Sequence, residues 1–126
     1  MKLNSSYTTK NPKELIVPVL GLVKNVTGYT SIQDETRYFR LEIDIESDTP
    51  PVKKVLFNEP LPIEKGDEIM AYLFKGYTKS GTYGSASPVF EETELREEEP
   101  AIKIEKLRDG EVVATYINNE FRDLFG

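Results

Sequence analysis

The stretch LIVPVLGLVKNV, from Leu15 to Val26, decides the fold that we expect for this chain of 126 residues. It is rich in aliphatic and β-branched residues, which favour strands, and it is about twice as long as an average strand. Gly21 near its middle predicts a bend or bulge, where one long strand can serve two sheets. Pro18 cannot donate to a strand ladder, so the first half is expected on an edge. A long, bent first strand is what a small closed barrel needs.

The segments that follow are typical of short antiparallel strands. Thr36–Glu46 alternates between apolar and polar residues, as a half-buried strand does. Val52–Phe57 predicts a third strand. Glu68–Phe74, which is apolar on both faces, predicts a central strand after the tight turn at Lys65–Asp67. Gly28–Glu35, between the first two strands, is expected to be a polar loop.

Residues Ala101 to Ile117 predict a hairpin, because Asp109-Gly110 is a favoured pair for a two-residue turn. This turn sets Arg108 opposite Glu111, a favourable pair of charges. The same register sets Leu107 opposite Val112, Glu105 opposite Ala114, Ile104 opposite Thr115, Lys103 opposite Tyr116, and Ile102 opposite Ile117. The core face is then expected to comprise Ile102, Ile104, Lys106, Val113, Thr115 and Ile117.

The chain is expected to have three parts: a flexible segment over 1–13, a β domain over 14–117 and a short C-terminal helix over 118–126. In the helix Phe121, Leu124 and Phe125 share one side at spacings of i, i+3 and i+4. They could plug the end of a barrel, or they could form a docking surface for a partner or a second copy of the chain. Residues 88–98 could form either a short helix or an irregular acidic loop.

The composition excludes several kinds of chemistry. The chain has no cysteine, histidine or tryptophan, so it lacks disulfides, thiolate metal sites and the commonest general base. The catalytic patterns GxSxG, Walker A and GxGxxG are also absent. We therefore expect a non-catalytic protein with no cofactor and no metal. Glu42 and Asp44 share a strand face and could hold a hard cation, but such pairs are common without one.

No apolar run approaches the roughly 18–20 residues that span a bilayer. The first residues, MKLNSSYTTK, also lack the apolar stretch of a signal peptide. We therefore expect a cytoplasmic protein without a membrane partner.

The negative charge is concentrated in one segment. The formal net charge is −6, and residues 91–99, EETELREEE, hold six glutamates against one arginine. The rest of the chain is nearly neutral, so the acidic balance does not exclude nucleic acid as a ligand. The acidic segment could be a solvated loop or could dock a basic partner.

The order of strands and turns resembles the OB-fold, and especially its archaeal branch related to replication protein A. The matching stretches are VLGLVKNVTG (19–28), RYFRLEIDI (37–45), KGDEIMAYLF (65–74) and IKIEKLRDGEV (102–112). The resemblance covers roughly residues 15–117 and implies a small antiparallel barrel of five or six strands that binds single-stranded nucleic acid. The chain departs from the family in having a short loop between the second and third strands and no tryptophan for stacking. Its likeliest internal helix also follows the fourth strand, whereas the family usually has one between the third and fourth strands.

The loop KGYTKSGTYG, from Lys75 to Gly84, is the strongest candidate for a ligand contact. It combines cations and aromatic rings, and no acid occurs between Ile69 and Phe90. Proteins that hold single strands use cations for phosphates and rings for base stacking. The expected clamp is Lys75, Tyr77, Lys79 and Tyr83, and the expected floor is Tyr38, Arg40, Lys103 and Tyr116.

Two functions remain open from the sequence. The first is a non-catalytic OB-like domain that binds single-stranded DNA or RNA through these residues. The alternative is a protein interaction or assembly module, with a protein partner or as a homodimer, that uses the acidic segment 91–99 and the C-terminal helix.

Overall fold

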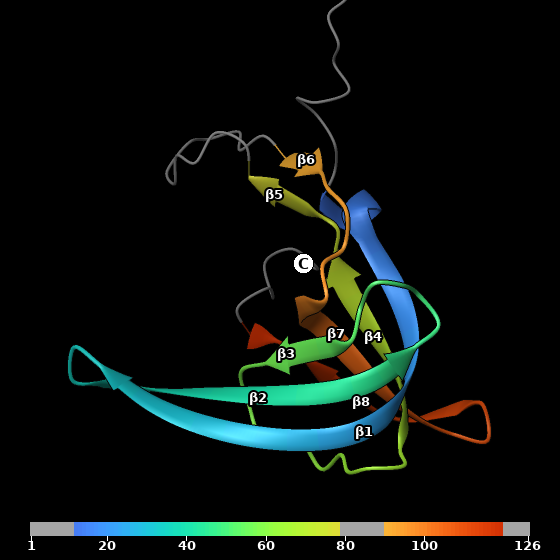
Figure 1. Cartoon of the computed structure of the whole chain (residues 1–126), viewed down its shortest axis with the longest axis horizontal. Coiled ribbons are helices and arrows are strands. Elements are labelled where there is room, and N and C mark those ends of the chain that lie inside the picture. Colours follow the sequence, from blue (N-terminus) through green and yellow to red (C-terminus); the bar gives the residue numbers. More distant parts are fainter. Residues whose placement is uncertain (1–11, 79–89, 120–126) are drawn as a thin grey trace, which may run out of the picture.

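The computed structural model describes residues 12–78 and 90–119, and this part of the chain is almost entirely β-structure (Figure 1). A short 3₁₀ helix, Pro12–Leu15, precedes the strands. The strands are β1 (Ile16–Gln33), β2 (Thr36–Ser47), β3 (Lys54–Phe57), β4 (Glu68–Phe74), β5 (Gly76–Thr78), β6 (Phe90–Glu92), β7 (Glu98–Arg108) and β8 (Glu111–Ile117).

The main sheet closes on itself through hydrogen bonds. Its order is β3-β2-β1-β4-β7-β8, and β3 also pairs with β7. The pairings therefore form a ring of β1, β2, β3, β7 and β4, with β8 attached outside it. The β3–β7 pairing is parallel and the other pairings are antiparallel. The expectation of an all-β, mainly antiparallel architecture is confirmed, and the ring makes it barrel-like.

The long first strand pairs with two neighbours within one sheet rather than serving two sheets, and its bulge lies at Lys24 rather than at Gly21. Residues Ile16–Leu22 pair with β4, and Gly21–Gln33 pair with β2, so the change of partner falls at Gly21. A Cβ at Gly21 would lie 2.9 Å from Cδ1 of Ile45, so the glycine lets Ile45 pack directly on the backbone of β1. Pro18 lies in the half that pairs with β4 alone.

The expected polar loop over Gly28–Glu35 is wrong. The strand β1 continues to Gln33, and only Asp34 and Glu35 form the turn, with φ of 49° and 66°. Two successive residues with positive φ give the turn whose twist suits a hairpin. We call residues 27–40 the arm, because the two strands extend beyond the rest of the sheet here, at the left of Figure 1.

The β7–β8 hairpin follows the predicted register only next to its turn. Arg108 pairs with Glu111 and Leu107 with Val112, and Asp109 and Gly110 have φ of 53° and 82°. The register then shifts by one residue, because Val113 is an extra residue in β8.

This bulge overturns part of the expected pairing and core. Ile104 pairs with Tyr116 instead of Thr115, and Lys103 pairs with Ile117 instead of Tyr116. Ile102 and Ile104 are fully buried, but Val113, Thr115 and Ile117 are exposed. The expectation that these three residues join the core is therefore wrong.

The core lies inside the ring and is built from alternate residues of its strands. In β4, and in β2 from Leu41 to Ile45, every second residue is buried. The largest fully buried side chains are Val19, Val23, Ile43, Val55, Ile69, Leu73, Ile102 and Ile104. The third strand starts at Lys54 rather than at Val52, although Val52 is itself buried.

Residues 90–98 contain no helix. Phe90–Glu92 form β6, which pairs with β5, and residues 93–97 are irregular. Most of the expected C-terminal helix and of the flexible segment over 1–13 lies outside the described residues. In the part of the chain that the structure describes, no helix is long and apolar enough to cross a membrane.

Candidate nucleic-acid interface

The outer face of the arm brings two exposed tyrosines and an arginine together. Tyr29 of β1 lies directly opposite Arg40 of β2, and Ser31 lies opposite Tyr38. Directly paired residues share a face, and side chains alternate along each strand. Since Leu41 is buried, Arg40 and Tyr38 face outward together with Tyr29. Tyr29 is 50% exposed and Tyr38 is 51% exposed, so both rings are accessible to a ligand.

Sequence reasoning named Tyr38 and Arg40 but missed Tyr29, because Tyr29 was assigned to a loop. The signal that could have found it is the stretch TGYTSI (27–32), since threonine, tyrosine and isoleucine favour strands. The turn Asp34-Glu35 hid this signal, because it lacks the glycine usual at such turns.

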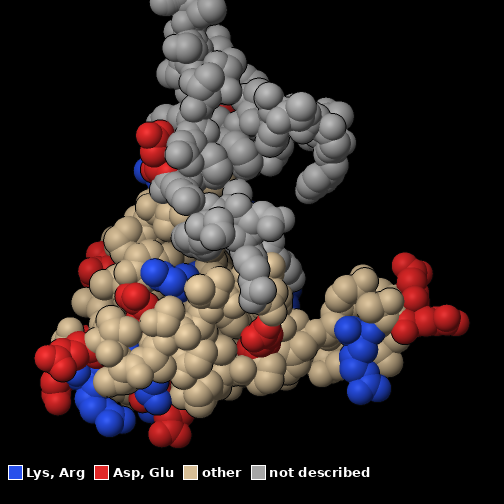
Figure 2. All heavy atoms as spheres, turned by 180° about the vertical axis from the view of Figure 1, so that it is seen from behind, with Lys and Arg blue, Asp and Glu red and all other residues tan. Residues whose placement is uncertain are grey.

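The opposite face of the arm has a different character. Ile32 is 67% exposed and lies opposite Arg37, while Phe39 is half-buried against the core. A Cβ at Gly28 would lie 3.1 Å from Cζ of Phe39, so the glycine makes room for this ring. Figure 2, which views the molecule from behind, shows the arm as a lobe at the right whose charged side chains gather at the far end.

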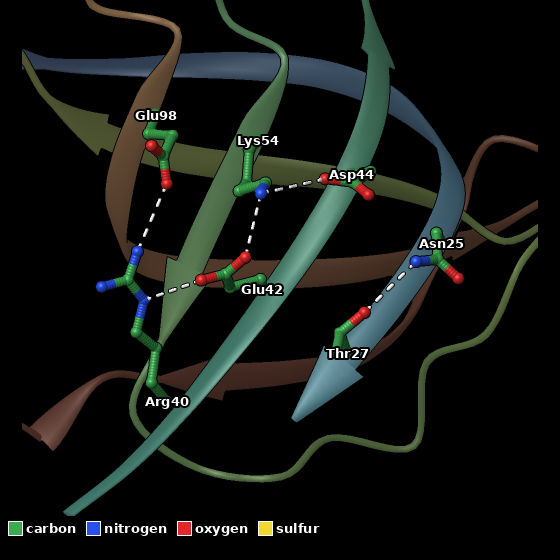
Figure 3. A network of polar contacts seen from close by, with 7 residues as sticks. All are labelled: Asn25, Thr27, Arg40, Glu42, Asp44, Lys54 and Glu98. Atoms are coloured by element: carbon green, nitrogen blue, oxygen red, sulfur yellow. Dashed lines mark hydrogen bonds and ion pairs between the residues drawn. The ribbon is translucent and has the colours of Figure 1, made fainter. Parts of the chain in front are cut away.

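A network of charges continues from the arm onto the outer face of β2 and β3 (Figure 3). The guanidinium of Arg40 lies 3.1 Å from a carboxylate oxygen of Glu42 and 3.3 Å from one of Glu98. The ammonium of Lys54 lies 2.9 Å from Glu42 and 3.6 Å from Asp44. Two cations thus meet three carboxylates, so this face is charge-compensated rather than basic.

The same network favours the protonated form of Lys54. Its hydrogen bond to Glu42 is the main cause that raises the pKa of Lys54, and the nearby charges of Glu42, Asp44 and Glu98 add to the effect. Glu42 and Asp44, considered above as cation ligands, are both engaged by Lys54. Among the described residues, no group of three or more carboxylates could hold a metal ion.

Two open hollows flank the network. One, of about 250 Å³, extends from Tyr38 and Arg40 across Leu56 to Pro100. The other, of about 700 Å³, lies between the bulge of β1 at Lys24 and the cis-linked Pro50-Pro51, with Asp44, Glu46 and Lys53 in its lining. The smaller hollow is continuous with the residues of the arm's outer face.

The expected loop clamp is described only in part. Lys75 forms an ion pair of 3.0 Å with Glu92, and its backbone bonds to Leu15 and Thr93. The backbone of Tyr77 belongs to β5, but the structure does not describe its side chain. Lys79 and Tyr83 also fall outside the described residues.

Lys103 and Tyr116 lie on a different wall from Tyr38 and Arg40. Lys103 is paired across the sheet with Tyr72 of β4, and its ammonium is 4.4 Å from the centre of that ring. The cation–aromatic contact therefore involves Tyr72 rather than the expected Tyr116. Tyr116 is half-buried and packs on the core. The structure brings Tyr38 and Arg40 together but does not bring Lys103 or Tyr116 to them.

The acidic segment 91–99 is tied to the rest of the chain. Glu92 pairs with Lys75, Glu97 with Lys53 at 3.2 Å, and Glu98 with Arg40. Glu99 is buried and accepts hydrogen bonds from the backbone and the guanidinium of Arg96. Four of the six glutamates in the segment thus form internal ion pairs. Phe121, Leu124 and Phe125, the other expected partner-binding residues, lie outside the described residues.

Comparisons with protein families, with curated proteins and with solved structures gave no significant match.

Proposed function

We propose that this chain is an OB-like barrel, over residues 14–117, that binds single-stranded nucleic acid without catalysing a reaction. The closed ring of five strands supports the fold assignment. OB-folds bind oligonucleotides on the face of the second and third strands and on the loops that join strands one to two and four to five. The corresponding parts here are the β2–β3 face, the arm, and the connection from Lys75 to Glu97.

The observation that carries the proposal is the group of Tyr29, Tyr38 and Arg40 on the outer face of the arm. Two exposed rings on one strand pair can each stack on a base, and each stacked base contributes about 1–3 kcal/mol. Arg40, directly opposite Tyr29, can contact a phosphate or a base plane. The hollow beside Tyr38 extends this surface onto β3.

The charges of the interface determine how such binding would depend on salt. Within the arm the charges of Arg37 and Arg40 are offset by those of Asp34 and Glu35. Arg40 also forms ion pairs with two carboxylates. Few cations are therefore available to replace counterions on the phosphates. We expect stacking to dominate and the affinity to fall only slightly with salt.

The alternative, an interaction module built on the acidic segment, has less support. A segment that docks a basic partner needs carboxylates whose charge is not already compensated, and at least four of the six glutamates in 91–99 pair with cations of the same chain. We therefore prefer nucleic acid as the ligand.

The test is fluorescence anisotropy with labelled oligo-dT and a mixed-sequence single strand, at about 50 mM and about 200 mM salt. We expect micromolar or tighter binding that weakens slightly at the higher salt. No binding of either strand at the lower salt would overturn the proposal.

Two pairs of variants then locate the site. Tyr29→Ala with Tyr38→Ala should weaken binding by about 2–4 kcal/mol, since two stacking platforms are lost. Ile32→Ala removes an exposed apolar side chain from the opposite face of the same arm, so it should leave the affinity unchanged. Tyr77→Ala with Tyr83→Ala tests whether the connection after β4 supplies further stacking, with a loss of similar size expected.

A further inference from the structure

Within residues 12–78 and 90–119, the strand β8 has one unpaired edge. Among the described residues it pairs only with β7. The chain then leaves this edge, because the backbone NH and the side chain of Asn118 bond to Ile102 and Ala101 of β7. Asn119 continues across to Glu59, beyond the end of β3. Asn118 and Asn119 therefore do not cover its outer edge.

The composition of β8 is unusual for an exposed edge. Residues 112–117, VVATYI, contain no charge and no proline, in a chain that is 30% charged. Val112, Val113 and Ile117 are each about half exposed. Proteins usually protect such edges with charges, proline or cover, because unpaired backbone groups invite another strand. The open half of β1, by comparison, carries Pro18.

The side chains of β8 fall into two sets. Tyr116 lies opposite the buried Ile104 and so points inward, together with Ala114. Thr115 and Ile117 alternate with them and therefore point outward. Val112 also faces outward, opposite Leu107, because the bulge at Val113 resets the alternation.

We propose that β8 pairs antiparallel with β8 of a second copy of this chain, about a twofold axis at Thr115. Directly opposite residues in an antiparallel pair share a face, so only registers in which outward residues meet outward residues join the two sheets smoothly. A register centred on Thr115 meets this condition for Ala114, Thr115 and Tyr116. It sets Thr115 opposite its own copy and Ala114 opposite Tyr116.

This register is also free of charge conflicts. It sets Val113 opposite Ile117, and Glu111 then lies beyond the last residue of the second β8, Ile117, rather than opposite the second Glu111. A twofold interface must be self-complementary, and an uncharged strand meets this requirement because no charge faces its own copy. An uncharged strand would give no selectivity for a different protein, because it carries no charges for that protein to complement.

The paired edges would join the two sheets in the order β7-β8-β8-β7. In the ring, the arm is separated from β8 by β4 and β7 in one direction and by β3 and β7 in the other. A single pair of strands buries an area at the low end for stable complexes, so we expect a dissociation constant in the micromolar to millimolar range.

Sedimentation equilibrium of the full chain, from about 1 µM to about 1 mM, tests the proposal. We expect a monomer–dimer equilibrium. Thr115→Lys places two ammonium groups opposite each other at the axis and should raise the dissociation constant at least about tenfold. Thr93→Lys adds the same charge at an exposed position in the irregular segment 93–97, outside the six-stranded sheet, and should leave the equilibrium unchanged.

A charge-swap experiment tests the position of the axis. Thr115→Glu alone should also raise the dissociation constant, whereas a mixture of Thr115→Lys and Thr115→Glu, each with a different fluorophore, should associate more tightly than either variant alone and give energy transfer. Val113→Lys provides a second variant on the same edge, and circular dichroism checks that each variant is folded. A wild-type chain that stays monomeric up to about 1 mM, or a dimer that Thr115→Lys and Val113→Lys both leave intact, overturns the proposal.

Discussion

Arg40 lies directly opposite Tyr29 across the β1–β2 ladder, yet its guanidinium is engaged by Glu42 and Glu98. Glu98 lies in β7, 58 positions after Arg40 in the chain. Its carboxylate comes within 3.3 Å of the guanidinium of Arg40 because β3 and β7 pair in parallel. The closure of the ring thus brings an acidic group to the base of the arm. A phosphate that approaches Arg40 must compete with that carboxylate.

Glu98→Gln should therefore strengthen the binding of single strands. Removing one of two carboxylate partners of a half-exposed arginine changes the interaction by about 0.2–1 kcal/mol, so we expect up to about a fivefold gain in affinity with oligo-dT. The dependence on salt should also become steeper, because one more cation is available to phosphate. Anisotropy titrations at several salt concentrations measure both effects.

Glu97→Gln is the matched control for this prediction. It changes the net charge equally but releases Lys53 instead of Arg40. Equal gains in the two variants would mean that net charge matters and that the Arg40–Glu98 pair does not.

Arg96→Ala should destabilise the fold, because Glu99 depends on it. The carboxylate of Glu99 is only 5% exposed and accepts hydrogen bonds of 2.8 Å from the backbone NH and 3.0 Å from the guanidinium of Arg96. The same hydrogen bond raises the pKa of Arg96. Without the guanidinium, a buried carboxylate loses its charge partner, and the expected cost is about 1–3 kcal/mol in urea unfolding.

The control for Arg96 is Arg108→Ala, which removes an exposed arginine at the tip of the β7–β8 hairpin. It should cost less than about 0.5 kcal/mol. In a double-mutant cycle, Arg96→Ala should cost much less when Glu99→Gln is already present. Strictly additive costs would show that the pair does not stabilise the fold.

Residue patterns predicted the first half of β1 and the strands β2, β3, β4, β7 and β8, because these depend on local properties. Alternation places the core side chains of β2, and Gly21 offers the space that Ile45 occupies. The arm was missed because Asp34 and Glu35 adopt positive φ without a glycine. Likewise, the bulge at Val113 leaves no mark in composition, yet it shifts the pairing of every later residue in β8.

The polar contacts of the interface could not be predicted, because they depend on which strands close the ring. Arg40 meets Glu98, and Lys103 meets Tyr72 rather than Tyr116, only through the pairings of β7 with β3 and β4. A sequence shows which residues can bind a ligand, but pairings between distant strands determine which of them already have partners.

Tyr72→Phe should lower stability at neutral pH and reduce its decline at alkaline pH. The hydroxyl of Tyr72 donates a hydrogen bond of 2.8 Å to Glu105, and this bond, with burial, raises the pKa of Tyr72 above its usual value. A raised pKa means that the contribution is complete below about pH 10, the pKa of an unperturbed tyrosine, and is lost as the pH rises through the folded-state value. Phenylalanine lacks this hydrogen bond throughout.

Urea unfolding at about pH 8 and at about pH 11 measures this effect. The variant should be less stable than wild type by about 0.5–1.5 kcal/mol at the lower pH, and the difference should shrink at the higher pH. Both proteins should still lose some stability, because the pKa of Lys54 is also raised and its ion pairs are lost in alkali. A constant difference between the two proteins would contradict the role assigned to the hydroxyl.

Gly21→Ala should destabilise the fold through one contact. The new Cβ would lie 2.9 Å from Cδ1 and 3.1 Å from Cβ of Ile45, which is itself buried. Either β1 or Ile45 must move, and such overpacking costs about 1–3 kcal/mol.

Gly28→Ala is the control, because its Cβ would meet the end of the half-buried Phe39 ring in the arm, which can shift more easily. Ile45→Val removes the closest atom, Cδ1, and should recover part of the loss when combined with Gly21→Ala, as measured by urea unfolding. Two outcomes would mean that the bend of β1 does not depend on this contact. In the first, Gly21→Ala is as stable as wild type. In the second, adding Ile45→Val to Gly21→Ala lowers stability further by the usual cost of that substitution, about 0.5–1.5 kcal/mol.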